Sequence, residues 1–333
     1  MRSHLRGRWQ MGQLDGLEQT FYNACVGRVQ YIEATCKSAL NRVQGMPFKW
    51  SLNPYRGCVH ACHYCYARAS HTYYDMNADE DFETKIVVKV NFPEVLRQEL
   101  RRPSWARELV ALGTVTDCYQ PAEGRYRITR RVLEALLERR NPMSMVTKSP
   151  MVLRDRDVLA RLAHAAPVRI AFTITTVDQK LWRAMEPGTA NPLKRLRVMR
   201  LLNEAGVASG VILAPILPGI TDSDEGIDSV AAAAAEHGAA FFWANALRLA
   251  PYVKEHYLGF LEQSFPDLLP LYQQTYPGTY APREYVQKLD QRIDSVRQRY
   301  GFEAGGMRYR DAGGQPSALR PPRQCGEQLA LPI

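Results

Sequence analysis

The run Cys58-Val-His-Ala-Cys62-His-Tyr-Cys65 decides how the rest of this chain is interpreted. Three cysteines within eight residues can converge on one soft metal centre, for which iron–sulfur clusters and zinc are the usual occupants. A structural zinc site needs four protein ligands, and no second Cys-x-x-Cys or His-x-x-x-His occurs in the sequence. His60 and His63 lie too close to the cysteines to complete the set. The pattern therefore indicates a four-iron cluster with three protein ligands and one open iron, rather than zinc or an inert cysteine group.

Composition predicts a globular protein of a reducing compartment. The 333 residues are 46% hydrophobic, enough for a buried core. No run approaches the roughly 20 apolar residues that span a bilayer, and no apolar segment of signal-peptide type follows the basic start. Seven cysteines, three of them clustered, suit metal ligation better than a disulfide framework. We therefore expect a cytoplasmic protein without a membrane segment.

The charge balance suits a polyanionic partner. The chain has 43 Lys and Arg against 34 Asp and Glu, a net charge of +9, which is compatible with nucleic acid. The basic residues are spread thinly, and the densest segments are residues 193–200 and the pairs Arg130-Arg131 and Arg139-Arg140. Both regions fall in predicted helices, where we expect their charges to face solvent.

Strands and helices alternate along most of the chain. After a first strand at residues 48–54 that leads into the cysteine run, we expect strands at 109–115, 143–146, 169–175, 207–213 and 240–244, with a further strand at 85–90. Amphipathic helices lie between them, and one of these is opened by Asn191-Pro192 and closed by Gly206. The alternation predicts six βα units with a parallel sheet. Periodicity alone does not separate a barrel from a doubly wound sheet.

The cysteine spacing resembles a known signature. Cys-x-x-x-Cys-x-aromatic-Cys is similar to the motif of the radical S-adenosylmethionine (SAM) superfamily, and Cys62-His-Tyr-Cys65-Tyr66 resembles its spore photoproduct lyase-like branch. The resemblance implies a partial (β/α)6 TIM barrel, a [4Fe–4S] cluster on Cys58, Cys62 and Cys65, and SAM bound at the open iron. It also implies reductive cleavage of SAM to a 5′-deoxyadenosyl radical that abstracts hydrogen from a substrate. An external one-electron reductant of flavodoxin or ferredoxin type would supply the electron.

The same resemblance implies contacts to SAM. The aromatic residue Tyr64 would pack near the adenine, and the segment from Thr116 to Glu123 resembles a polar loop of the lyase-like branch that approaches SAM. Further candidates follow parallel strands, whose carboxyl ends carry the functional groups of barrels. The candidate SAM-binding residues are Tyr64, Asp117, Glu123, Lys148, Ser149 and Thr175. Structural alternatives remain for three of them: Asp117 as a helix cap, Lys148 as a solvated charge and Thr175 as a strand former.

Cys118 and Tyr66 are the candidate hydrogen-transfer pair. In spore photoproduct lyase a cysteine beyond the second strand passes hydrogen atoms with help from the tyrosine after the third cluster cysteine. Tyr66 matches that tyrosine, whereas the neighbours of Cys118 depart from the lyase pattern, and a buried structural cysteine is the alternative. Glu186, in a Glu-Pro turn, is either a ligand contact or a loop cap.

We divide the chain into an N-terminal extension (1–45), a radical SAM partial barrel (46–250), a helical C-terminal region (251–300) and a flexible tail (301–333). The substrate is open: a nucleic-acid lesion or nucleotide is one prediction, and a small molecule or peptide is another. An auxiliary cluster on Cys25, Cys36 and Cys325 has no support from spacing. The alternative from another class is a non-catalytic iron–sulfur or zinc protein that acts in binding or sensing.

Overall fold

A computed structural model describes residues 29–302 of the chain. The predicted tail lies outside this range except for Gly301 and Phe302, and so do Cys25 and Cys325. Within the described part, no helix is long and apolar enough to cross a bilayer.

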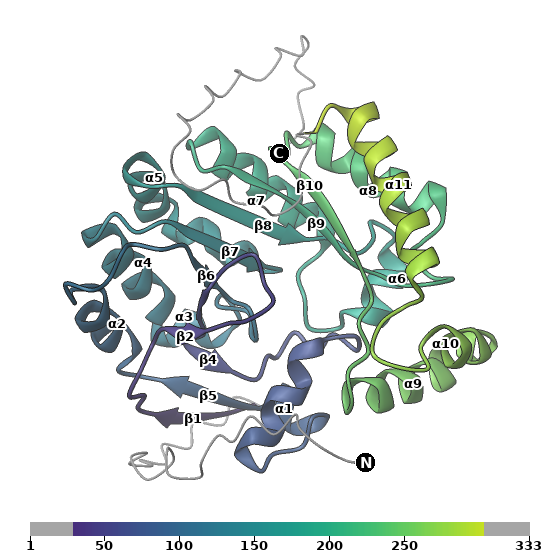
Figure 1. Ribbon diagram of the computed structural model, residues 1–333, viewed down its shortest axis with the longest axis horizontal. Coiled ribbons are helices and arrows are strands. Elements are labelled where there is room, and N and C mark those ends of the chain that lie inside the picture. Colours follow the sequence, from purple (N-terminus) through teal and green to yellow (C-terminus); the bar gives the residue numbers. More distant parts are fainter. Residues whose placement is uncertain (1–28, 303–333) are drawn as a thin grey trace, which may run out of the picture.

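An open, curved sheet of seven strands forms the centre of the molecule (Figure 1). Its strand order is β10-β9-β8-β7-β6-β3-β2, in which every pair is parallel except β2–β3. The strands are β2 (Asn41–Arg42), β3 (Trp50–Leu52), β6 (Val110–Leu112), β7 (Met143–Thr147), β8 (Val168–Thr173), β9 (Ser209–Ile216) and β10 (Phe242–Ala246). The six parallel strands are the six predicted from the sequence. Their largely apolar composition follows from burial on both faces, and the open partial barrel is confirmed.

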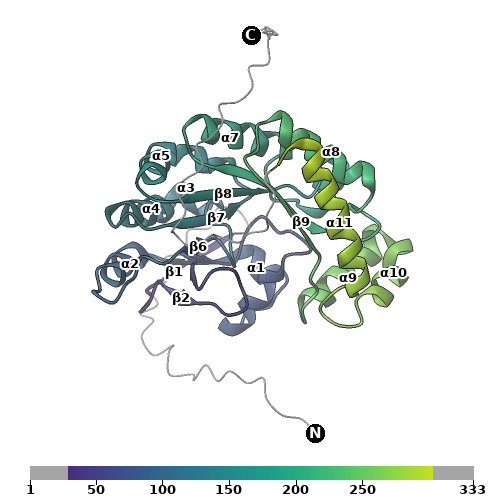
Figure 2. The same cartoon turned by 45° about the horizontal axis from the view of Figure 1, so that its top comes forward.

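Helices cover the outer side of this sheet (Figure 2). They are α2 (Phe92–Leu100), α3 (Ala122–Tyr126), α4 (Ile128–Glu138), α5 (Arg156–Ala165), α6 (Gln179–Met185), α7 (Pro192–Glu204) and α8 (Asp224–Glu236), with the 3-10 helix η3 (Pro150–Asp155). The predicted signals of α7 are confirmed. The Asn191 side chain accepts a hydrogen bond from the Leu193 amide at 2.8 Å, and Gly206 takes φ +79° after the last turn.

A second, smaller sheet lies beside the barrel. It consists of β1 (Gln30–Ala34), β5 (Lys85–Lys89) and β4 (Tyr55–Arg56), in the order β1-β5-β4. The predicted strand at residues 85–90 therefore exists but pairs outside the barrel. A 3-10 helix, η2 (Tyr66–Tyr74), and α1 (Glu80–Thr84) connect the cysteine run to β5.

The C-terminal region is helical, as predicted, and packs against the cysteine run. It contains α9 (Val253–Ser264), η4 (Pro266–Leu268), α10 (Leu269–Thr275) and α11 (Arg283–Tyr300). Figures 1 and 2 place α9 and α10 together at one side of the barrel. An apolar cluster distinct from the main core joins Cys62 and Tyr64 to Tyr257, Phe260 and Leu261 of α9. The helical region thus covers one side of the segment that carries the three cysteines.

Candidate active site

The cysteine loop, residues 57–65, follows β3 and β4 and is anchored at its first residue. Gly57 has φ +76°, and a Cβ there would lie 2.9 Å from the carbonyl oxygens of both Phe82 and Lys85. The Cys58 amide donates to the Phe82 carbonyl at 2.8 Å. Only glycine meets both the backbone conformation and this close approach, so the loop begins where α1 packs against it.

Two polar residues after β6 hold the same end of the loop. The Gly57 carbonyl accepts hydrogen bonds from the Thr116 hydroxyl at 2.7 Å and from the Gln120 side-chain amide at 2.9 Å. The other end of the Gln120 amide accepts from the Val59 backbone at 3.3 Å. Sequence reasoning placed this segment near SAM but did not assign it this anchoring role.

The three thiols fit an iron–sulfur cluster by their chemistry. Cys58 and Cys62 are buried and Cys65 is half-buried. Burial, the Asp117 carboxylate and the neighbouring thiols raise the pKa of Cys58. Burial with Glu186 and Cys65 raises the pKa of Cys62 to about 12, although Lys148 opposes this rise. Among residues 29–302 no three ligating side chains are gathered for a single metal ion. In a four-iron cluster each cysteine binds a different iron, and binding would displace the thiol protons.

A buried carboxylate, Glu186, joins the loop to the barrel. The hydroxyl of Tyr64 donates to Oε1 of Glu186, and the hydroxyl of Thr175 donates to the same oxygen at 2.8 Å. Oε2 accepts from the guanidinium of Arg195 at 2.6 Å, and both side chains of this ion pair are fully buried. Two predicted SAM-binding residues, Tyr64 and Thr175, are thus brought together, with their hydroxyls bonded to Glu186.

Electrostatics at Glu186 favour the charged state. Burial opposes ionisation, but the positive charges of Arg195 and Lys148 outweigh it and hold the pKa of Glu186 at about 2. Burial likewise lowers the pKa of Lys148, whereas Cys62 and Glu186 raise it, and the net shift is upward. The Lys148 ammonium lies 5.6 Å from the centre of the Tyr64 ring. A charged lysine therefore stands directly beside the cysteine loop.

Asp117 forms a second polar centre next to the first. Its carboxylate accepts from the Thr147 hydroxyl at 2.8 Å and the Lys148 amide at 2.7 Å, and its Oδ2 lies 3.4 Å from Nδ1 of His60. The Ser149 hydroxyl accepts from the Met151 amide at 3.3 Å and begins η3. Asp117 thus fixes the loop after β7 against the cysteine loop, and the structure gives Ser149 a capping contact.

The turn after α6 presses directly on the loop. The Gly188 amide donates to the His60 carbonyl at 3.1 Å. A Cβ on Gly188 would lie 2.1 Å from the Val59 carbonyl oxygen, a separation that no side chain permits. The Glu-Pro-Gly turn is therefore shaped for contact with residues 59 and 60.

Three other predicted residues have partners or surroundings that do not point to SAM or to hydrogen transfer. Both oxygens of Glu123 are used by protein partners, among them Tyr55 at 2.5 Å and Arg154 at 2.6 Å, so a contact with SAM gains no support. Cys118 is fully buried in the main core, and burial raises its pKa. Tyr66 is 54% exposed while its hydroxyl donates to the Thr114 carbonyl. The hydrogen-transfer role of Cys118 and Tyr66 stays a prediction.

Comparison with known proteins agrees with this architecture. The sequence profile of the Radical SAM superfamily matches residues 52–229. An uncharacterized protein of Mycobacterium tuberculosis (strain H37Rv) is 40% identical over 276 residues, which cover 82% of this chain and 81% of the relative. The chain belongs to the radical SAM superfamily. Membership implies SAM and a [4Fe–4S] cluster as cofactors, and a one-electron reductant from outside.

Solved radical SAM structures show the same fold. Spore photoproduct lyase complexed with dinucleoside spore photoproduct superposes with a TM-score of 0.63 at 18% identity, over 81% of this chain and 79% of that chain. A lyase mutant with bound SAM and the same dinucleoside gives 0.61 at 19% identity, over 78% and 76%. An uncharacterized protein of Methanocaldococcus jannaschii is 27% identical, over 59% of this chain and 71% of the relative.

Two buried arginines of this radical SAM protein were missed by sequence reasoning. Residues 193–200 were expected to face solvent, which is wrong for Arg195, because the structure buries it completely against Glu186. Arg68 is also fully buried and donates to the Cys62 carbonyl at 3.1 Å and to the carboxylate of Glu83. In the sequence, only its position three residues after Cys65 indicated that Arg68 could contact the cysteine loop. Neither contact is visible in the local pattern.

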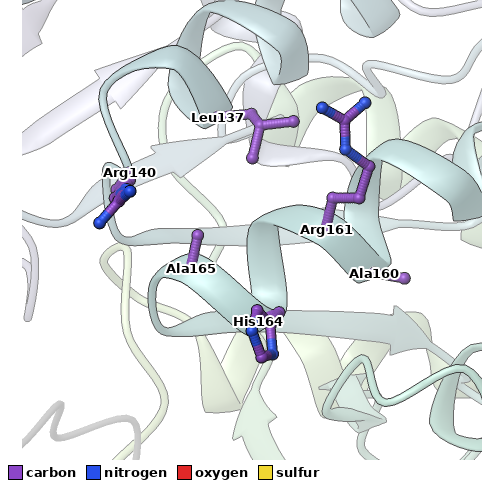
Figure 3. A pocket seen from close by; sticks show the side chains of 6 residues that line it. All are labelled: Leu137, Arg140, Ala160, Arg161, His164 and Ala165. Atoms are coloured by element: carbon purple, nitrogen blue, oxygen red, sulfur yellow. The ribbon is translucent and has the colours of Figure 1, made fainter.

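A surface cavity lies far from the cysteine loop. It measures about 520 Å³ and is lined by Leu137, Arg140, Ala160, Arg161, His164 and Ala165 (Figure 3). These residues belong to the C-terminal ends of α4 and α5, at the amino ends of β7 and β8. Basic side chains at helix C-termini complement the helix dipole, so the cavity needs no ligand to explain it.

Gly188→Ala should disturb the cysteine loop, because the added Cβ has no room beside Val59. We expect a loss of about 1–3 kcal/mol in the free energy of unfolding, as for overpacked sites, measured by urea denaturation. Gly259→Ala is the matched control: it lies in α9 with no atom within 4 Å of the added Cβ, and alanine favours a helix. Equal stability of Gly188→Ala and wild type would contradict the described contact.

The Glu186 carboxylate should make stability pH-dependent. Its pKa falls from 4.5 to about 2 on folding, so its contribution is present above about pH 4.5 and is lost as the pH falls toward 2. At about 1.4 kcal/mol per pKa unit this amounts to about 3 kcal/mol.

We therefore expect Glu186→Gln to be less stable than wild type near pH 7, because Arg195 loses its buried counter-charge. The variant should also lose less stability than wild type between about pH 5 and about pH 3. Chemical denaturation of cluster-free protein at each pH measures both effects, with the exposed Glu236→Gln as control. Parallel pH profiles for Glu186→Gln and wild type would refute the assignment.

Proposed function

We propose that this protein is a radical SAM enzyme that binds a [4Fe–4S] cluster through Cys58, Cys62 and Cys65 and acts on a nucleic-acid lesion or a nucleotide. The observation that carries the proposal is the cysteine loop itself. The backbone that carries its three thiols is held by α1 and by the segments that follow β6 and α6. When bound, the cluster and SAM supply the one-electron chemistry that generates the 5′-deoxyadenosyl radical.

The residues around the loop have separate roles in this proposal. Lys148 remains protonated beside Cys62 and offers its charge to the carboxylate of SAM. The Tyr64 ring is fixed by the hydrogen bond from its hydroxyl to Glu186, and in this proposal it packs near the adenine. Asp117 orients the loop that carries Lys148. Apolar residues of α9 close one side of the site and exclude water.

Exposed aromatic and basic groups near the loop support a nucleic-acid substrate. Tyr66 and Tyr280 are 54% and 65% exposed, and the guanidinium of Arg248 lies 5.0 Å from the centre of the Tyr280 ring. Arg248 follows β10 and is near enough to Tyr66 to oppose the rise in pKa that burial of its hydroxyl causes. Tyrosine faces stack on bases, and a guanidinium pairs with phosphate. The net charge of +9 agrees with this surface.

Anaerobic reconstitution with iron and sulfide tests the chemistry. We expect four irons per chain and, after addition of SAM and dithionite or a reduced flavodoxin, formation of 5′-deoxyadenosine. Cys58→Ala, Cys62→Ala and Cys65→Ala should each abolish it, whereas Cys36→Ala, outside the loop, should not. One zinc per chain without SAM binding would instead favour a binding or sensing protein.

Arg248→Ala and Tyr280→Ala test the substrate class. Each should weaken the binding of a short single-stranded oligonucleotide. The loss of one stacked base weakens the free energy of binding by about 1–3 kcal/mol. The loss of one phosphate contact reduces the slope of log binding constant against log salt concentration by about one.

Fluorescence anisotropy at several salt concentrations measures both effects. Arg197→Ala, which removes an exposed charge of α7 without a partner among the described residues, is the control. Unchanged binding in both variants would contradict a nucleic-acid substrate at this surface and would leave a nucleotide, another small molecule or a peptide as the substrate class.

A further inference from the structure

A chain of three side chains leads from the cysteine loop to the surface. His63 lies between Cys62 and Tyr64, and its ring stacks on Phe260 of α9 with centroids 4.1 Å apart and planes 8° apart. Its Nδ1 is 3.2 Å from Nε2 of His256, which lies one helical turn before Phe260 on α9. Nδ1 of His256 is in turn 2.6 Å from the Asp79 carboxylate. The cysteine loop and the residue just before α1 therefore meet α9, far away in sequence, through one series of hydrogen bonds.

The carboxylate determines which atoms carry the protons. An ionised aspartate only accepts hydrogen bonds, so the Nδ1–H of His256 must donate to Asp79. In neutral His256 the Nε2 atom is then an acceptor, and the bond to His63 requires a proton on Nδ1 of His63. Burial lowers the pKa of His256, which favours the neutral ring at neutral pH and above. A free neutral histidine side chain prefers the Nε2–H form, so these hydrogen bonds select the less common tautomer of His63.

Hydrogen bonds of the backbone hold the segment around His63 in addition to the contacts of its side chain. The His63 amide donates to the Met185 carbonyl at 3.2 Å, and the Cys65 amide donates to the Cys62 carbonyl at 3.2 Å. Arg68 donates to the same Cys62 carbonyl at 3.1 Å, and also to the Asp79 carbonyl at 3.3 Å. Asp79 is thus linked to the loop twice. Its backbone carbonyl binds Arg68, which binds the Cys62 carbonyl, and its carboxylate binds His256, which binds His63. The His63 side chain itself is held by α9.

We propose that His256, oriented by Asp79, is a positioning residue for the cluster: it fixes the His63 side chain and, together with the backbone hydrogen bonds, the geometry between Cys62 and Cys65. The inference rests on the proposed cluster. Hydrogen bonds and solvent access around cysteine ligands set the reduction potential of iron–sulfur clusters. Loss of the hydrogen-bonded series Asp79–His256–His63 should therefore alter the electronic state of the cluster without removing a ligand.

The first test needs no cluster. In cluster-free protein labelled with ¹⁵N-histidine at about pH 8, above the ordinary histidine pKa, long-range ¹H–¹⁵N correlation reports the tautomer of each ring. We expect His63 to be protonated at Nδ1 in wild type and in Asp79→Asn, whose amide oxygen still accepts from His256. In Asp79→Ala and His256→Ala this preference should be lost. An Nε2–H tautomer for His63 in wild type would overturn the proposal.

The second test uses the reconstituted protein. We expect His256→Ala and Asp79→Ala to retain four irons but to shift both the EPR spectrum of the reduced cluster and its midpoint potential. Asp79→Asn should match wild type, because it restores the acceptor. Glu255→Ala should also match, since this exposed neighbour on α9 has no side-chain partner among residues 29–302.

The outcomes separate this inference from the proposed function. Wild-type spectra and potentials in both alanine variants would refute the positioning role. So would a shift in Asp79→Asn as large as that in Asp79→Ala, because that result would reflect the lost charge. If wild type forms no cluster, the proposed function fails, and the positioning role for a cluster fails with it, whereas the tautomer measurement still decides whether the hydrogen-bonded chain exists.

Discussion

The buried ion pair between Glu186 and Arg195 is the interaction on which the site depends most. Moving two charges out of water is costly, and the cost is offset only when the pair has good geometry and further hydrogen bonds. Here the carboxylate also bonds to Tyr64 of the cysteine loop and Thr175 after β8. The guanidinium also donates to the Thr173 carbonyl at 2.9 Å. One buried pair thus joins the loop, the sheet and α7.

The cysteine loop is positioned mainly by hydrogen bonds of its backbone. The backbones of Cys58, Val59 and Cys62 make hydrogen bonds with Phe82, Gln120 and Arg68. In addition to burial, neighbouring thiols of the loop raise the pKa of Cys58 and of Cys62, and Lys148 opposes that rise at Cys62. A site arranged in this way requires little reorganisation when a cofactor binds, because the folded chain has already restricted the ligand backbone. The contact of Gly188 with His60 belongs to the same restriction.

The two ends of the barrel differ in chemistry. At the carboxyl ends of the strands lie the cysteines, Lys148, Asp117 and Glu186, as expected for parallel barrels. At the amino ends, the cavity between α4 and α5 carries arginine and histidine side chains that suit helix C-termini. Basic residues at that end therefore contribute to the net charge without contributing to the site.

The sequence by itself determined the six parallel strands, the helix signals at Asn191 and Gly206, and the cysteine spacing that indicates the superfamily. These features are local, since hydrophobic periodicity and short motifs are complete within a few residues. Only the tertiary structure decided that Arg195 is buried, that residues 85–89 pair outside the barrel, and that His63 meets His256 and Asp79. The physical reason is that burial and pairing depend on which distant segments come together, and nothing within each segment records its partner.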